Sequence, residues 1–215
     1  MSHEESRRPL KVRSTAWSKN IASFLSKQNI TPNQISLASI FFSILASICI
    51  LLITKSETNT NIWVWSILSA VFIQMRLLCN LFDGMVALEG GKSTKSGELY
   101  NDIPDRVSDS ILFIALGYST SYIEIGYLAS LFAMMTAYVR VLGASMNAGS
   151  IFIGPMAKQH RMAILTICSL ITPLENMFIE HSYYVLSFAL FIIMLGSVLT
   201  VVNRAYNIYK ILEAK

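Results

Sequence analysis

Charged residues are scarce in this chain. Lys, Arg, Asp and Glu make up 14% of its 215 residues, hydrophobic residues make up 53%, and the mean hydropathy is +0.52. Soluble domains typically contain about 25% charged residues. The scarcity excludes an ordinary soluble protein and predicts an integral membrane protein, with one membrane domain and no separate soluble domain.

Cysteine and histidine are also rare, with three residues of each. Cys49, Cys79 and Cys168 lie in apolar stretches, and their odd number and wide spacing exclude a cysteine metal site, so we interpret them as buried thiols. The chain has no internal repeat, which argues against a transporter. We expect no cleavable signal, because no small-residue cleavage pattern accompanies the first apolar run. The net charge of +4 does not require a nucleic acid, and we expect none as partner.

Six largely apolar runs have about the length of a membrane helix, which is about 20 residues, although four of them contain charged residues. They span residues 35–53, 62–82, 106–123, 125–146, 162–179 and 183–202. The predicted fold class is therefore an all-α integral membrane protein, a six-transmembrane-helix bundle formed by residues 31–215.

An amphipathic segment precedes the first apolar run. Residues 14–27 place Trp17, Ile21 and Phe24 on one face at helical spacing, and Trp17 with a basic flank suits the headgroup region. We expect an N-terminal interfacial helix that forms, with the preceding residues, a cytoplasmic unit over 1–30. A short soluble helix is the alternative.

Basic residues predict the orientation of the bundle. In the six-helix arrangement one side has only Lys55, and fourteen basic residues lie on the other: Arg7, Arg8, Lys11, Arg13, Lys19, Lys27, Lys92, Lys95, Arg106, Lys158, Arg161, Arg204, Lys210 and Lys215. By the positive-inside rule, both termini face the cytoplasm. We expect the bacterial inner (cytoplasmic) membrane, with the active site on the cytoplasmic face.

Two of the predicted helices have uncharged stretches that are too short to cross a bilayer. The uncharged stretches 62–75 and 110–123 have 14 residues each, roughly 21 Å at 1.5 Å per residue, against a hydrocarbon core of about 30 Å. The flanking polar residues, among them Arg76, Asp83 and Asp109, must therefore lie at membrane depth. Charges there are costly and usually serve function.

These polar residues form two stripes. Asn80, Asp83, Gly84 and Ala87 fall within about 100° in helical projection, and Gly97, Asn101 and Asp105 recur every four residues. Carboxylate and amide oxygens without His or Cys suit hard cations such as Mg²⁺, Mn²⁺ or Ca²⁺. The stripes predict a divalent-cation site between two helices.

The stripes resemble the signature of the CDP-alcohol phosphotransferase family, D-x-x-D-G-x-x-A-R, eight residues, then G-x-x-x-D-x-x-x-D. The matching segments are Asn80-Leu-Phe-Asp83-Gly84-Met-Val-Ala87 and Gly97-Glu-Leu-Tyr-Asn101-Asp-Ile-Pro-Asp105. The stretches 31–36 and 154–161 are similar to the start of the family's first membrane helix and to its basic loop before helix five. The resemblance covers most of the chain.

The resemblance implies a membrane enzyme of phospholipid synthesis, a transferase of the EC 2.7.8 type. Members transfer a substituted phosphate from a CDP-linked donor, often CDP-diacylglycerol, to a small alcohol acceptor, release CMP and use Mg²⁺ or Mn²⁺. Homodimers among membrane lipids are usual. By the family pattern, Asp105 is the catalytic base. The implied metal ligands are Asn80, Asp83, Asn101 and Asp105, and the implied donor-binding residues are Gly84, Ala87, Gly97 and Asn33.

Three basic residues are candidates for contact with an acceptor phosphate or with the charged donor. Arg140, Lys158 and Arg161 lie near the predicted cytoplasmic ends of helices four and five. Positive-inside anchoring is the alternative role.

The signature is altered at three positions. Asn80 and Asn101 replace the first and third aspartates of the family pattern, and Leu88 replaces its arginine. Each Asn lowers the negative charge by one and cannot bridge two metals as a carboxylate can. The altered signature therefore leaves two questions open. The site could bind one cation or two, and the protein could be a transferase or a non-catalytic lipid- or CDP-lipid-binding membrane protein.

Structural roles are the alternatives for the same polar residues. An ion pair between Arg76 and Asp83 and interhelical hydrogen bonds of the two asparagines would need no ligand. A further alternative is a second acidic cluster, formed by Glu98, Asp102, Asp105 and Asp109.

Overall fold

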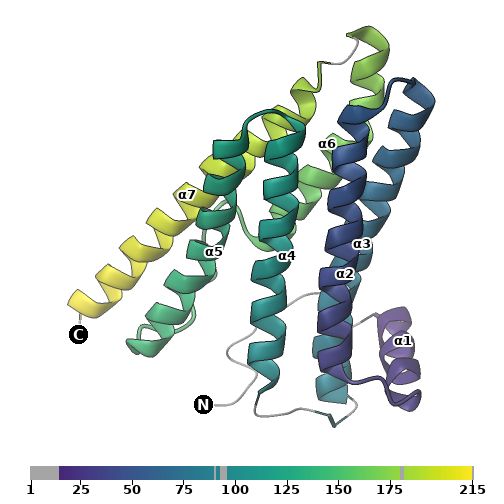
Figure 1. Ribbon diagram of the computed structural model, residues 1–215. Coiled ribbons are helices and arrows are strands. Elements are labelled where there is room, and N and C mark those ends of the chain that lie inside the picture. The colour runs from purple at the N-terminus through teal and green to yellow at the C-terminus, as the bar shows by residue number, and fades with distance from the viewer. Residues whose placement is uncertain (1–14, 90, 93–95, 180–181, 215) are drawn as a thin grey trace.

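The structure is a computed structural model that describes residues 15–89, 91–92, 96–179 and 182–214 (Figure 1). These residues form helices and no strands, which confirms the all-α fold class. The predicted cytoplasmic stretch 1–14 lies outside the described residues. The helices are α1 (Ala16–Lys27), α2 (Pro32–Lys55), α3 (Asn59–Glu89), α4 (Gly97–Ser119), α5 (Ile123–Ser145), α6 (Lys158–Phe178) and α7 (Tyr184–Glu213).

Four of these helices, α2, α3, α5 and α7, are long and apolar enough to cross a membrane. The other two long helices carry more polar residues: α4 contains three aspartates, and α6 begins with Lys158 and Arg161. The six-helix count therefore remains a prediction for α4 and α6.

The start of α2 is fixed by its sequence. Thr31 Oγ1 accepts a hydrogen bond from the Gln34 amide at 3.3 Å, and Gln34 Oε1 accepts one from the Thr31 amide at 2.9 Å. Pro32 occupies the first helical position, where no amide hydrogen is needed. This capping box explains the motif at 31–36 and sets the orientation of Ser36, one turn into the helix.

The turn between α4 and α5 lies earlier in the chain than predicted. A break at residue 124 is wrong, because α4 ends at Ser119 and Glu124 lies in the first turn of α5. Thr120 Oγ1 donates to the Leu116 carbonyl at 2.9 Å, and Ser121 takes a left-handed φ of 60°. Thr120 thus helps to end this helix, since its side chain satisfies a terminal carbonyl of α4.

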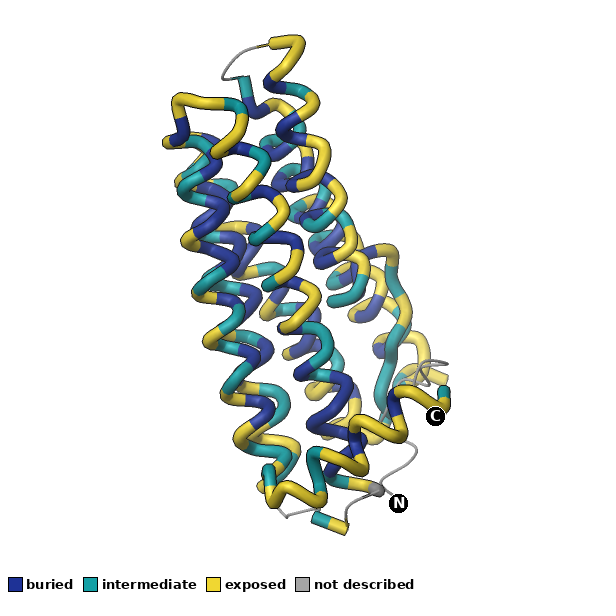
Figure 2. The backbone as a smooth tube through the Cα atoms, turned by 90° about the vertical axis from the view of Figure 1, so that its right-hand side faces the viewer, coloured by how far each residue is buried: buried dark blue, intermediate teal, exposed yellow. Residues whose placement is uncertain are grey.

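Packing centres on α2, which lies against both α3 and α4, while α5 packs between α4 and α7. Buried aliphatic and aromatic side chains from α2 to α7 form the main core, including Ile50, Ile73, Phe113, Leu165 and Leu190. Figure 2 shows buried residues following the inner faces of the helices. In Figure 1, the distance between the pair α5 and α7 and the pair α2 and α3 increases from the α4–α5 turn towards the opposite end of the bundle.

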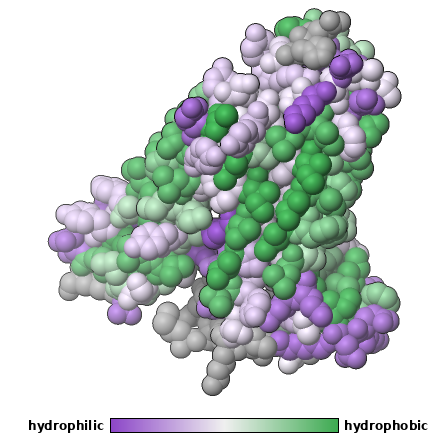
Figure 3. Space-filling view, in the orientation of Figure 1, coloured by the Kyte–Doolittle hydropathy of each residue, from purple (hydrophilic) through white to green (hydrophobic). Residues whose placement is uncertain are grey.

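The outer surface is apolar around the middle of the bundle. Large hydrophobic side chains such as Phe41, Leu131, Phe188 and Leu199 are exposed. Figure 3 shows hydrophobic side chains between hydrophilic ends. Such a belt suits contact with lipid rather than water. Cys49, Cys79 and Cys168 are free and buried, as predicted.

The first helix, α1, packs against the end of α3. The rings of Trp17 and Phe82 meet edge to face with centroids 6.2 Å apart, and Ala22 is buried in the same cluster. Ile21 and Phe24 remain exposed. An exposed apolar face is compatible with an interfacial position, which remains a prediction.

A close glycine contact joins α4 to α5. A Cβ atom on Gly126 would lie 2.8 Å from the Phe113 carbonyl oxygen and 2.9 Å from the Gly117 Cα. Both neighbours are backbone atoms, so a side chain would force the two helices apart.

We therefore expect Gly126→Ala to destabilise the protein. Overpacking typically costs about 1–3 kcal/mol, which corresponds to a lower melting temperature by a few degrees. Gly143→Ala on the same helix is the matched control, because its methyl group would meet the movable tip of Ile208. Thermal unfolding in detergent measures both. Equal melting temperatures for the two variants would contradict the close-contact interpretation.

Candidate active site at the carboxylates of α4

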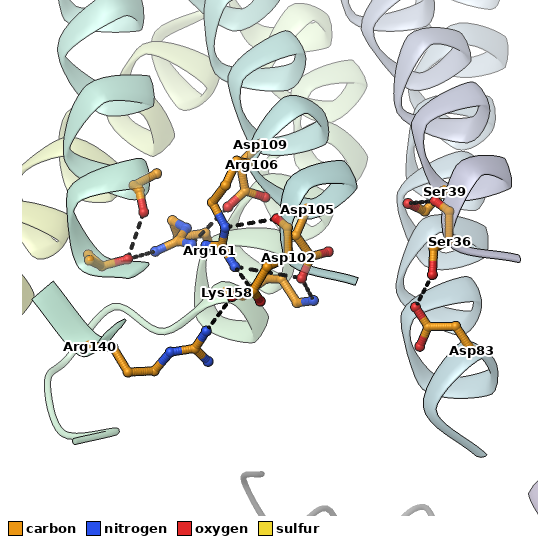
Figure 4. Close-up of polar contacts among 12 residues, drawn as sticks. Ser36, Ser39, Asp83, Asp102, Asp105, Arg106, Asp109, Arg140, Lys158 and Arg161 are labelled. Atoms are coloured by element: carbon orange, nitrogen blue, oxygen red, sulfur yellow. Dashed lines mark hydrogen bonds and ion pairs between the residues drawn. The ribbon is translucent and has the colours of Figure 1, made fainter. Parts of the chain in front are cut away.

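Three aspartates of α4 lie on one face of the helix, at spacings of three and four residues. We call Asp102, Asp105 and Asp109 the α4 carboxylates. Their partners are mainly basic side chains of α3, α5 and α6, as Figure 4 shows for Arg140, Lys158 and Arg161. These basic residues are distant from α4 in the sequence, so it is folding that brings them to the α4 carboxylates.

Asp109 is the most enclosed of the α4 carboxylates. Its Oδ1 accepts from Arg76 Nη2 at 2.6 Å, and its Oδ2 accepts from Arg161 Nη2 at 2.8 Å. All three side chains are at most 3% exposed. Charge-assisted hydrogen bonds of this kind are short and strong, and they join α3, α4 and α6. The alternative pairing of Arg76 with Asp83 is wrong.

The Arg161 guanidinium extends this network to two further helices. It donates to the Met156 carbonyl at 3.0 Å and to Thr136 Oγ1 at 3.5 Å. Arg204 of α7 donates to the Thr136 carbonyl at 2.5 Å and to the Ile153 carbonyl at 2.9 Å. Both Nη atoms of Arg161, which was predicted to contact an acceptor phosphate, are thus engaged within the protein, and only its buried Nε has no hydrogen-bond partner among the described residues.

Asp105 lies one turn away, towards the start of α4, and is 5% exposed. Lys158 Nζ donates to its Oδ2 at 2.5 Å, and Arg106 Nη2 lies 3.8 Å from the same oxygen. Its Oδ1 is 3.7 Å from Arg76 Nη2, is buried, and has no hydrogen-bond partner among the described residues. One oxygen is therefore held by an ammonium, and the other lies near a guanidinium without accepting a hydrogen bond.

The remaining α4 carboxylate is more accessible. Asp102 is 40% exposed and pairs with Arg140 at 2.9 Å and with Arg106 at 3.7 Å. The Arg140 guanidinium also lies over the ring of Phe152, 5.6 Å from its centroid. The predicted acceptor residue Arg140 is thus placed at the rim of the carboxylate face by Asp102, which was not among the predicted site residues.

Asp83 forms a separate polar pair on the neighbouring helices. Its Oδ2 accepts from Ser36 Oγ at 2.7 Å, and its Oδ1 accepts from the Gly84 amide at 2.5 Å. Figure 4 shows this pair apart from the α4 carboxylates. Asp83 is nevertheless close enough to Asp105 and Lys158 to interact with them electrostatically.

The two asparagines of the signature differ in their surroundings. Both side-chain atoms of Asn80 that can hydrogen bond are buried and have no partner among the described residues. Asn101 is partly buried on α4. A buried amide without a partner is costly, so Asn80 is a group that a ligand or water would satisfy.

The predicted donor-binding residues occupy neighbouring helix ends. Gly84 is buried, Ala87 is partly buried on α3, Gly97 begins α4, and Asn33 lies in the first turn of α2. Small side chains leave space next to Asp83. The link around residues 89–95 falls largely outside the described residues.

Comparison with known proteins identifies the family. Residues 29–206 match the model of the CDP-alcohol phosphatidyltransferase family. The chain belongs to this family. It is 29% identical over 201 residues to an uncharacterized protein of Aquifex aeolicus, covering 91% of this chain and 90% of the relative. It is 26% identical over 197 residues to archaetidylinositol phosphate synthase of Pyrococcus horikoshii, covering 91% and 92%.

The family fold also appears among solved structures. Phosphatidylinositol phosphate synthase (PgsA1) of Mycobacterium tuberculosis with CDP-DAG bound superposes with a TM-score of 0.70 at 16% identity, covering 91% of this chain and 94% of that one. The same enzyme in complex with manganese and citrate gives a TM-score of 0.68 at 16% identity, covering 89% and 88%. This phosphatidyltransferase-family chain therefore has the same fold. Its four helices of membrane-spanning length and apolarity support an integral membrane protein.

The donor set of this family member fits a divalent cation in part. Among the described residues, no three His, Cys, Asp or Glu side chains gather closely enough to form a metal-binding group. Oxygen donors are nevertheless present, because the Asn80 carbonyl and Asp105 Oδ1 are buried without partners. Asp83 supplies a further carboxylate on α3, three residues after Asn80. These hard oxygen ligands suit Mg²⁺ or Mn²⁺.

The sequence did not indicate the contribution of Ser36 and Arg106 to this site, and it indicated Asp102 only as part of the alternative acidic cluster. Only Asp102 carried a usable signal, since it shares a helix face with Asp105 and Asp109. Ser36 is an ordinary helix residue until folding places it beside Asp83.

We expect Asp109→Asn to destabilise the protein severely. The change leaves two buried guanidinium groups around a neutral amide, and breaking a buried ion pair typically costs about 3–5 kcal/mol. Asp102→Asn is the control, because a pair at this exposure contributes about 0–1 kcal/mol. The melting temperature in detergent and the yield of monodisperse protein measure both variants. A small loss for Asp109→Asn would refute its structural role.

Proposed function

We propose that this protein is a phosphotransferase of phospholipid synthesis. It transfers a phosphatidyl-type group from a CDP-linked lipid, CDP-diacylglycerol or a close analogue, to a small alcohol and releases CMP. Membership of the family and a donor-bound structure of a protein with the same fold support this assignment. We further propose that it works as a homodimer.

The state of Asp105 carries the proposal. This carboxylate is buried, Lys158 orients one of its oxygens, and the other oxygen has no hydrogen-bond partner among the described residues. A general base needs a free, oriented oxygen next to the group that it deprotonates. Such a group in an otherwise neutralised cluster is difficult to explain by folding alone.

The reaction is a substitution at phosphorus. The alcohol oxygen forms a bond to the β-phosphorus of the donor, and the bond from that phosphorus to the bridging oxygen of CMP breaks. The alcohol proton passes to Asp105 and then to water. A bound Mg²⁺ or Mn²⁺ would neutralise the diphosphate and stabilise the leaving CMP.

The chain's own residues supply binding and orientation. Asp83, Asn80, Asn101 and Asp105 are the proposed cation ligands. Space for the nucleotide would come from the small residues after Asp83 and at the start of α4, with Asn33 at the start of α2. Ser36 and the Gly84 amide hold Asp83 in a fixed orientation.

The acceptor phosphate, if the acceptor carries one, would bind at the rim. Lys158, Arg140 and Arg106 are each partly exposed, at 25%, 23% and 19%. Arg161 is 1% exposed and bound to Asp109, so we assign it a positioning role instead. Arginine and lysine at an accessible rim suit phosphate recognition.

The membrane and its sidedness follow from the basic residues. Lys92 precedes α4, Arg106 lies in α4 and Lys158 begins α6, whereas Lys55 is the last residue of α2, at the end opposite Ser36. By the positive-inside rule we propose a cytoplasmic membrane, the bacterial inner membrane, with the site open to the cytoplasm.

An apolar cavity lies away from this site. It has a volume of about 630 Å³ and is lined by α2 and α4 residues from Ile44 to Lys55 and from Ile111 to Tyr118. Because it extends towards the Lys55 end of α2, we do not assign it to the reacting part of the donor.

A non-catalytic lipid-binding role is the second candidate. Basic residues of the protein pair with each α4 carboxylate, so the cluster is stable without a cation. A protein that only binds a CDP-lipid would need this stable cluster but no catalytic cation.

Activity distinguishes the two candidates. We expect the purified protein to release CMP from CDP-diacylglycerol with one of a panel of alcohols, in a reaction that chelator abolishes. Asp105→Ala should lower the rate by about 10²–10⁴, the usual contribution of a general base. Glu98→Ala, exposed at the start of the same helix, should retain the rate. Donor binding without CMP release would favour the binding role.

The signature asparagines provide a separate test of the cation site. We expect Asn80→Asp with Asn101→Asp to bind Mn²⁺ about tenfold more tightly, since added ligand charge raises affinity. Asn203→Asp, exposed on α7, controls for net charge. Titration of the free Mn²⁺ signal by electron paramagnetic resonance measures the affinity. No change would mean that these positions are not ligands.

A further inference from the structure

We infer that Lys158 is a built-in competitor of the divalent cation at Asp105. The cation binds tightly only when an anionic substrate draws the Lys158 ammonium away, so cation and substrate bind together. The inference rests on the proposed function and adds an order of binding to it. It concerns a contact within this chain, between the first residue of α6 and the last residue of the signature.

The contact itself is the first step. Lys158 Nζ lies 2.5 Å from Asp105 Oδ2, the distance of a short charge-assisted hydrogen bond. An ammonium at that distance occupies the place where a cation would approach the same oxygen. Oδ1 of Asp105 has no hydrogen-bond partner among the described residues, although Arg76 lies 3.7 Å from it.

The charges around Asp105 are the second step. Arg76 and Arg106 lie 3.7 Å and 3.8 Å from its oxygens, in addition to Lys158. Lys158 also begins α6, and the amide dipoles of a helix start add partial positive charge. A divalent cation entering this environment is repelled by each of these charges. The neutral amide of Asn80, unlike an aspartate, does nothing to offset them.

The freedom of the three cations is the third step. Arg76 is 0% exposed and bound to Asp109 at 2.6 Å, so it cannot leave. Arg106 is tied by its Nε to the Asp102 carbonyl at 3.3 Å. Lys158 is 25% exposed, and among the described residues its ammonium hydrogen bonds to one side chain, that of Asp105. The ammonium on its flexible stem is therefore the charge that can move.

An anionic substrate offers Lys158 another partner. A phosphate group at the rim near Lys158 would accept from its ammonium and release Asp105 Oδ2. Binding of the anion then favours the cation, and by linkage the cation favours the anion to the same extent. In the protein without metal or substrate, basic side chains balance the negative charges of the α4 carboxylates.

The test measures Mn²⁺ affinity without any turnover. In detergent and without substrate, we expect Lys158→Met to bind Mn²⁺ about tenfold more tightly than the unsubstituted protein, measured by electron paramagnetic resonance. Lys158→Arg, which keeps the charge, should leave the affinity unchanged. Lys55→Met, exposed at the other end of α2, controls for the loss of one lysine. Equal affinities of Lys158→Met and the unsubstituted protein would overturn the inference.

Two further arms locate the effect. Combining Lys158→Met with Asp105→Asn should abolish the gain, and a gain that persists would mean that the competition is not at Asp105. Inorganic phosphate, corrected by a titration without protein, should tighten Mn²⁺ binding to the unsubstituted protein but not to Lys158→Met. Equal tightening in both would overturn the coupling.

The outcome is independent of the activity assay. Monodisperse elution and an unchanged melting temperature of each variant establish that it is folded. A tenfold gain in Lys158→Met, together with no CMP release from any alcohol, would retain the competition and reject the transferase. CMP release with equal Mn²⁺ affinities would retain the transferase and reject the competition.

Discussion

The buried carboxylate of Asp109, held between Arg76 and Arg161, is the interaction on which the rest of the structure depends. It joins α3, α4 and α6, and through Thr136 and Arg204 the same network reaches α5 and α7. Packing between apolar helices in a membrane has little hydrophobic driving force, so polar contacts fix which faces meet. The position of Asp105, one turn away, follows from this junction.

Charge balance explains how so many ionised groups coexist in one bundle. Unpaired charges at membrane depth are costly, and here each carboxylate of α4 has a basic partner. The loss of two aspartates from the family signature, at Asn80 and Asn101, fits the same balance. Because basic side chains balance its carboxylates, the site is stable in the absence of metal. Asn80 and one oxygen of Asp105 remain without hydrogen-bond partners among the described residues and could bind a ligand.

Much of the fold was predictable, and the pairing within the site was not. Long apolar runs predicted the helices, and the spacing of Asp83, Gly84 and Asp105 indicated the family. The partners of these residues depend on helix rotation, which one sequence does not reveal. The alternative pairing of Arg76 with Asp83 rested on spacing alone, whereas Arg76 contacts Asp109. Likewise Arg161 resembled a free phosphate ligand in sequence, because its burial arises only from packing.

The segment that leads into α6 has a consequence for insertions and deletions. The Ile153 carbonyl accepts from Arg204, and the Met156 amide donates to Thr200 Oγ1 at 2.9 Å, so α7 holds this non-helical backbone in a fixed register. Each residue gained or lost after these anchors would turn α6 by about 100°. Lys158 and Arg161 would then leave their carboxylates, so the segment tolerates changes of side chain far better than changes of length.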